Sequence, residues 1–173
     1  PRDLSNLESK IKKNTKVIYL ESPGSYTFEI IDINKTVKLA KKHKLITIIG
    51  NTWGTALYFN AIKFGVDIVV EAITKYIGGH SDVMMGVTVC NKKHLNSIIR
   101  WKRNSGQCVG PDDIFLALRG LRTLPLRLEK SQKNSIKLAK FLSYQKEVKK
   151  VYHPALKEHP DHKLWKRDFS GAC

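Results

Sequence analysis

Short apolar segments alternate with amphipathic segments over the first 90 residues, and this alternation limits the fold more than any other feature. The apolar segments, each of strand length, are residues 16–20, 45–49, 66–70 and 85–90. The second of them, Leu-Ile-Thr-Ile-Ile, is apolar on both faces, as buried parallel strands are. Between the first two, Asp32 can cap a helix that continues to about His43. The pattern therefore predicts an α/β layered fold with a parallel or mixed sheet.

After residue 94 the chain becomes mainly helical in pattern. Asp112 and Asp113 directly follow Pro111, which is typical of the first turn of a helix. Gly120 and Pro125 interrupt the long apolar pattern that comes next. Because both residues disfavour the interior of a helix, the sequence predicts a kinked or segmented helix there.

The last 45 residues contain two further predicted elements, an amphipathic helix over 132–144 and a short strand over 148–152 that would begin a second, incomplete domain. The histidines that follow, His153, His159 and His162, lie in a polar stretch with prolines, which predicts loop and surface. Their spacing is not that of metal ligands, so no metal site is predicted.

Composition excludes several classes of protein. The net charge of +16 suggests nucleic-acid binding as a hypothesis, but the lysines are spread over polar helix faces without an Arg-rich block or interleaved aromatic residues. Specific nucleic-acid binding is therefore not expected, although weak nonspecific attraction is. No apolar run reaches the roughly 20 residues that span a bilayer, so no membrane segment is predicted. Three cysteines without zinc-ligand spacing indicate reduced thiols and a cytoplasmic protein.

One lysine has an unusual setting. Lys75 follows an apolar strand segment and precedes the turn Gly78-Gly79, within the stretch 67–82. A lysine amine attacks carbonyl groups only when it is neutral, and removal of water favours the neutral form. The alternative is an ordinary surface lysine, since the chain has 31 Lys and Arg residues.

Three more motifs accompany this stretch: residues 21–29 (Glu-Ser-Pro-Gly-Ser-Tyr-Thr-Phe-Glu), residues 51–53 (Asn-Thr-Trp) and residues 119–124 (Arg-Gly-Leu-Arg-Thr-Leu). Together the four motifs resemble the Cys/Met-metabolism family of pyridoxal-phosphate-dependent enzymes. The motifs at 21–29 and 51–53 are most similar in sequence to those of bacterial cystathionine β-lyases, and the resemblance continues up to residue 172. It implies part of a type I (aspartate aminotransferase-like) large domain over residues 1–125. Residues 126–173 would form an interdomain helix and the start of the small carboxyl-terminal domain.

The resemblance also implies roles for individual residues. Lys75 matches the lysine that forms the Schiff base with the cofactor and moves the substrate α-proton, and Thr74 matches a hydroxyl that binds the cofactor phosphate. Gly50 stands where the family has an aspartate that pairs with the pyridine nitrogen. Ala72 stands where the family has a serine that also binds phosphate. Neither Gly50 nor Ala72 can perform those roles, because both lack the polar group.

The resemblance implies a chain about twice as long as this one. We therefore expect a truncated family member, inactive or weakly active alone because its active site is incomplete. The family reaction eliminates homocysteine from cystathionine, an amino-acid thioether, with pyruvate and ammonia as the other products. A cystathionine γ-synthase or γ-lyase type of enzyme is the alternative, as is a non-enzymatic remnant that acts as an interaction module. The family also implies a homotetramer.

Overall fold

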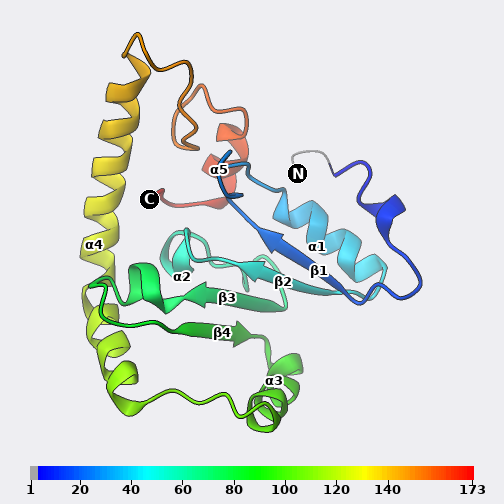
Figure 1. The fold of residues 1–173 in the computed structure, drawn as a ribbon. Coiled ribbons are helices and arrows are strands. Elements are labelled where there is room, and N and C mark those ends of the chain that lie inside the picture. Colours follow the sequence, from blue (N-terminus) through cyan, green and yellow to red (C-terminus); the bar gives the residue numbers. More distant parts are fainter. Residues whose placement is uncertain (1–3) are drawn as a thin grey trace.

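The structure is a computed structural model that describes residues 4–173, and its centre is a four-stranded mixed sheet (Figure 1). The strands lie in the order β1-β2-β3-β4. Their bounds are Val17–Glu21 for β1, Ile46–Gly50 for β2, Ile68–Ala72 for β3 and Gly86–Cys90 for β4. The first three strands are parallel and β4 is antiparallel to β3. The four strands expected from the apolar segments are thus confirmed, with ends shifted by no more than two residues.

Helices and turns connect and flank the strands. Their bounds are η1 Glu8–Lys10, α1 Ile33–Lys42, α2 Thr55–Tyr58, η2 Ile73–Ile77, α3 Lys92–Asn104, α4 Pro111–Ser143 and α5 His162–Asp168. The predicted cap of α1 is confirmed, since the Asp32 side chain accepts a hydrogen bond from the Lys35 backbone N–H at 3.1 Å. Asp32 also pairs with Arg167 at 3.0 Å, which joins α1 to α5.

The hydrophobic core lies on one face of the sheet. Ile18, Leu20, Ile49 and Val69 point to this face and pack with buried residues of α1 and with Phe169, which follows α5. The Phe169 ring stacks on Phe59 with a centroid distance of 4.6 Å. The carboxyl-terminal segment is thereby joined to the core formed by the first 70 residues.

The opposite face of the sheet is largely exposed within residues 4–173, although Ile68 on this face is buried. Its side chains include three large apolar groups with substantial exposure, Val17, Tyr19 and Val70. The sequence pattern of β2 predicted burial on both faces, but within the described residues only one face is buried. The carboxyl ends of β1, β2 and β3 lie at the same end of the sheet, and η2, which follows β3, packs against α4 (Figure 1).

Helix α4 differs from the expectation that Gly120 and Pro125 would divide it. It runs without interruption over 33 residues, with Pro125 inside it. Gly120 serves a packing role, because a β-carbon there would lie 2.2 Å from the Ile77 carbonyl oxygen. The glycine permits close contact between α4 and η2 rather than ending the helix.

Two smaller expectations about the carboxyl-terminal region were wrong. Residues 148–152 form no strand and pair with none of the four strands of residues 4–173. His153 and His159 are in loops as expected but are buried, since this segment folds back onto α4. Among the described residues no helix is both long and apolar enough to cross a bilayer.

Candidate active site

A cavity of about 1110 Å³ opens at the carboxyl ends of the parallel strands. Most of its lining comes from the ends of the first three strands and the segments that follow them: Glu21, Pro23, Gly24, Ser25 and Phe28 for β1, Thr52 and Trp53 for β2, and Thr74, Lys75 and Tyr76 for β3. This edge is where ligands bind in open α/β sheets. The cavity is slightly larger than the usual range for small-molecule sites, about 300–1,000 Å³.

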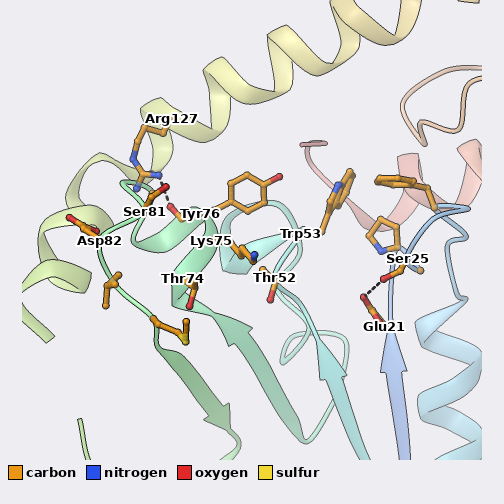
Figure 2. Close-up of a pocket in the computed structure, with 16 residues that line it drawn as sticks. Glu21, Ser25, Thr52, Trp53, Thr74, Lys75, Tyr76, Ser81, Asp82 and Arg127 are labelled. Carbon is orange, nitrogen blue, oxygen red and sulfur yellow. Dashed lines mark hydrogen bonds between the residues drawn. The ribbon is translucent and has the colours of Figure 1, made fainter. Parts of the chain in front are cut away.

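Lys75 lies inside the turn η2, on the sheet side of the cavity and near Thr52 and Thr74 (Figure 2). Its carbonyl accepts a hydrogen bond from Gly79 N at 2.8 Å, so the glycine turn expected from sequence forms around it. The Lys75 side chain is exposed, however, and not desolvated as its position after a buried strand suggested. Desolvation of the amine therefore requires atoms other than those of residues 4–173.

Arg127 of α4 fixes the backbone of this turn. Its guanidinium donates to the carbonyls of Tyr76 at 2.5 Å and Ile77 at 3.1 Å, and to Gly120 within its own helix at 2.7 Å. Gly79 has a φ of +75°, and a β-carbon there would lie 2.1 Å from Arg127 Nη1. The two glycines and the arginine thus form one packed unit around the residues next to Lys75.

The motif at 119–124 contributes to the same unit through a charge pair. Arg119 is hydrogen-bonded to the carboxylate of Asp82, which ends the Lys75 motif. Both motifs are present in the sequence, but nothing in the sequence indicates that they contact each other. The structure joins them through α4 and the loop after η2.

The Thr74 hydroxyl is engaged with the start of β4. It donates to the Met85 carbonyl at 3.2 Å and accepts from the Met85 N–H at 3.0 Å. A hydroxyl has one proton, so Thr74 cannot donate to a phosphate in this arrangement. Thr52 differs, because its oxygen accepts from Ala72 N at 2.8 Å and its proton has no acceptor among residues 4–173. Sequence reasoning missed Thr52, although it stands within the Asn-Thr-Trp motif.

Gly50 and Ala72 are brought together in a smaller neighbouring cavity of about 350 Å³. Thr52, Trp53, Glu21 and Pro23 line both cavities, so the two adjoin. A β-carbon on Gly50 would lie 3.1 Å from the Tyr19 hydroxyl oxygen. The position that the resemblance assigns to a carboxylate is therefore next to a phenol.

Glu71 is a buried carboxylate that sequence reasoning also missed. Its side chain is 5% exposed, and Oε1 accepts a hydrogen bond from Asn51 Nδ2 at 3.1 Å. Burial raises the pKa of the Glu71 carboxyl above its usual value, although the Asn51 hydrogen bond acts in the opposite direction. An acidic residue within the apolar run of β3 was the available signal.

Tyr76 and Cys173 lie side by side at the edge of the larger cavity. Burial raises the pKa of the Tyr76 phenol to about 12 and that of the Cys173 thiol to about 11. Both groups are therefore neutral at physiological pH, and neither is activated as a nucleophile.

Trp53 forms an aromatic wall of the site. It makes edge-to-face contacts with Phe28 at 6.4 Å and with Phe169 at 5.8 Å between ring centroids. Its indole Nε1 is buried and has no hydrogen-bond partner in the described part of the chain. A buried donor without a partner is an expected feature of a site that binds a polar ligand.

An exposed amine in a turn at the carboxyl edge of a parallel sheet, beside hydroxyls and an aromatic wall, is the arrangement of a pyridoxal-phosphate-dependent enzyme. The family model described as "Cys/Met metabolism PLP-dependent enzyme" matches residues 1–173. The chain belongs to this family.

Relatives and solved structures agree with that assignment. The chain is 44% identical over 169 residues to a cystathionine β-lyase of Haemophilus influenzae and 42% identical over 171 residues to an L-alanine/L-glutamate racemase of Wolbachia pipientis wMel. It covers 43% and 42% of those proteins, which cover 96% and 99% of it. It also resembles the structure of cystathionine γ-lyase from Lactobacillus plantarum complexed with L-serine, with a TM-score of 0.94 and 35% identity. That match covers 99% of this chain and 45% of the other, so this chain spans less than half of all three.

The residues present fit pyridoxal phosphate in part. They provide an accessible amine, an available hydroxyl on Thr52, an unpaired indole N–H and a cavity large enough for the cofactor. They provide no carboxylate at Gly50 and no hydroxyl at Ala72. The anchoring end of the site thus fits the cofactor, whereas ring and phosphate recognition is incomplete in this chain.

Proposed function

We propose that this chain is the cofactor-anchoring segment of a cytoplasmic, pyridoxal-phosphate-dependent carbon–sulfur lyase of the cystathionine β-lyase type. The observation that carries the proposal is Lys75 in its glycine turn, at the cavity formed by the ends of three parallel strands. The substrate would be an amino-acid thioether.

Lys75 would bind the cofactor through its Nζ atom and then move the proton of the substrate α-carbon. Pyridoxal phosphate supplies an electron-accepting ring for the electrons of the broken Cα–H bond. With that ring in place, removal of the α-proton by Lys75 would allow the Cβ–S bond to break; the sulfur would take up a proton and leave as homocysteine, and water would release the remainder as pyruvate and ammonia. Thr52 would donate its free hydroxyl proton to the ligand, and Trp53 would exclude water from one side.

We further propose that the chain alone has little or no lyase activity. Three observations support this: Gly50 and Ala72 lack the polar groups, the Thr74 proton is used by Met85, and the Lys75 amine is exposed. Residues 1–125 would be the partial cofactor-binding domain, and residues 126–173 the interdomain helix and the beginning of the next domain.

A homotetramer is proposed from exposed apolar side chains on α4. Phe115 is 65% exposed, and Leu118 and Leu121 on the same helix are about half exposed. Apolar groups gathered in this way are typical of a subunit interface. Because the lysines are evenly distributed, no specific nucleic-acid partner is proposed.

The test is covalent capture of the cofactor by the purified 173-residue chain. Mixing with pyridoxal phosphate and then borohydride should yield a stable adduct of one cofactor per chain, located at Lys75 by peptide mass spectrometry. Lys75→Ala should lose this adduct, whereas Lys93→Ala, a change in exposed α3, should retain it. An adduct spread over many lysines and unchanged in Lys75→Ala would contradict the proposal.

Amino-acid racemisation is a second candidate, favoured by the 42% identity to the Wolbachia pipientis racemase. Both reactions require Lys75 to move the α-proton, and they differ in whether the Cβ–S bond then breaks. A γ-synthase or γ-lyase reaction is the third, favoured by the Lactobacillus plantarum structure. Assays on the chain for thiol and pyruvate, for D-alanine and for 2-oxobutyrate distinguish the three. Absence of all these products together with absence of the Lys75 adduct would favour a non-enzymatic remnant.

A further inference from the structure

The hydroxyl end of the Tyr19 side chain lies beside Gly50, the last residue of β2. The three heavy atoms nearest to the position of a Gly50 β-carbon are Tyr19 Oη at 3.1 Å, the Leu20 carbonyl oxygen at 3.9 Å and Tyr19 Cζ at 3.9 Å. The hydroxyl is therefore the part of the ring that meets Gly50. A β-carbon at 3.1 Å is tighter than ordinary contact, so the glycine is what permits the phenol to lie there.

The Tyr19 hydroxyl lies next to the position where the resemblance assigns an aspartate carboxylate. An aspartate side chain at position 50 would extend from the β-carbon into the space that the phenol oxygen already borders. Tyr19 and Gly50 both line the smaller cavity, which adjoins the cavity of Lys75. The Tyr19 hydroxyl has no hydrogen-bond partner within residues 4–173, although the side chain is 63% exposed on the uncovered sheet face. Its donor capacity is thus free for a ligand.

The carboxylates of Glu71 and Glu21 are nearby, but neither lies beside the Gly50 β-carbon position as the Tyr19 hydroxyl does. Glu71 points to the core face of β3, together with Val69, and Asn51 holds its Oε1. Glu21 is in register with Gly50, but its Oε1 accepts from Ser25 Oγ at 3.0 Å. No atom of Glu21 is closer to the Gly50 β-carbon position than the 3.9 Å contacts of its neighbours.

We propose that the Tyr19 hydroxyl is the hydrogen-bond partner of the cofactor ring nitrogen in this chain, in place of a carboxylate. The inference rests on the proposed function, since it requires pyridoxal phosphate at Lys75. A phenol is a neutral donor, so it binds the unprotonated ring nitrogen, whereas a carboxylate keeps that nitrogen protonated. Tyr19 is thus a positioning residue that leaves the ring a weaker electron acceptor than a carboxylate would.

The experiment compares two probes, pyridoxal phosphate and the analogue that carries C–H in place of the ring nitrogen. Dissociation constants are measured by calorimetry for the wild-type chain, Tyr19→Phe and the control Glu21→Gln. The wild-type chain should prefer pyridoxal phosphate by about 2- to 13-fold, the range for one neutral hydrogen bond. Tyr19→Phe should bind both probes equally, and Glu21→Gln should keep the preference. The measured quantity is the ratio of the two dissociation constants within each variant, so a general loss of affinity, which weakens both probes alike, does not change it.

A second readout is the ¹⁵N chemical shift of labelled cofactor bound to the chain. The wild-type chain should give the shift of a neutral ring nitrogen, and Tyr19→Phe with Gly50→Asp should give that of a protonated one. A preference unchanged in Tyr19→Phe, or lost in Glu21→Gln, would overturn the inference alone. Binding of neither probe, or binding indifferent to Lys75→Ala, would overturn the proposed function and the inference with it.

Discussion

Replacement of Arg127 by leucine should destabilise the chain by removing the contacts that hold the Lys75 turn against α4. The guanidinium makes three hydrogen bonds to backbone carbonyls, those of Tyr76, Ile77 and Gly120. Hydrogen bonds that involve a charged group contribute about 1.5–3 kcal/mol each. Water can reach part of this half-buried site and compensate, so we expect a loss of about 3 kcal/mol in the free energy of unfolding.

The assay is urea denaturation followed by circular dichroism, and the matched control is Arg122→Leu. Arg122 is exposed on the same helix and makes no hydrogen bond among residues 4–173, so its replacement should cost less than about 0.5 kcal/mol. Arg127→Lys should be intermediate, because an ammonium group keeps the charge but cannot reach three carbonyls with the geometry of a guanidinium. Equal losses for Arg127→Leu and Arg122→Leu would refute the reasoning, since the turn would then not depend on the guanidinium.

Gly120→Ala should lower the melting temperature, because its β-carbon would lie 2.2 Å from the Ile77 carbonyl; Gly110→Ala, where the nearest contact is 3.6 Å, should change it little in the same thermal scan. Equal shifts in the two variants would argue against close packing as the cause. Glu71→Gln should raise stability at pH 8 more than at pH 4.5. Burial raises the pKa of the Glu71 carboxyl, so the folded state prefers the protonated form, and the wild type loses stability as pH rises above the unfolded value. Denaturation curves that differ by the same amount at both pH values would show that Glu71 does not titrate with folding.

The strands were predictable because their signal is local. Four apolar segments of five or six residues, separated by turn and helix patterns, predicted all four strands, and the Asp32 cap predicted the start of α1. The continuity of α4 was not predictable, because the reason for Gly120 is a contact with Ile77, 43 positions earlier in the sequence. A glycine that breaks a helix and a glycine that lets another segment approach it look identical in the sequence.

The parts of the candidate site that belong to a sequence motif could be predicted, whereas the burial and the hydrogen-bond partners of their side chains could not. The Lys75 turn and its glycines formed as expected, but the exposure of the Lys75 amine depends on which surfaces cover the cavity. Thr74 matched a phosphate ligand by position, yet its hydroxyl is paired with Met85, 11 positions away and just before β4. Tyr19 was missed because an aromatic residue in a strand usually indicates packing, and its relation to Gly50 arises only when β1 and β2 pair.

The length of α4 has a mechanical consequence. A helix of 33 residues is about 50 Å long, and this one is attached at two separate points. Its first half holds the Lys75 turn through Arg127, and beyond that point Gln132 Oε1 accepts from Ala172 N at 2.7 Å while Ser135 contacts His153. Because a helix is stiff along its axis, a tilt imposed on the carboxyl-terminal segment is transmitted to the backbone of Tyr76 and Ile77, directly after Lys75. The orientation of the amine is therefore coupled to whatever binds the carboxyl-terminal segment.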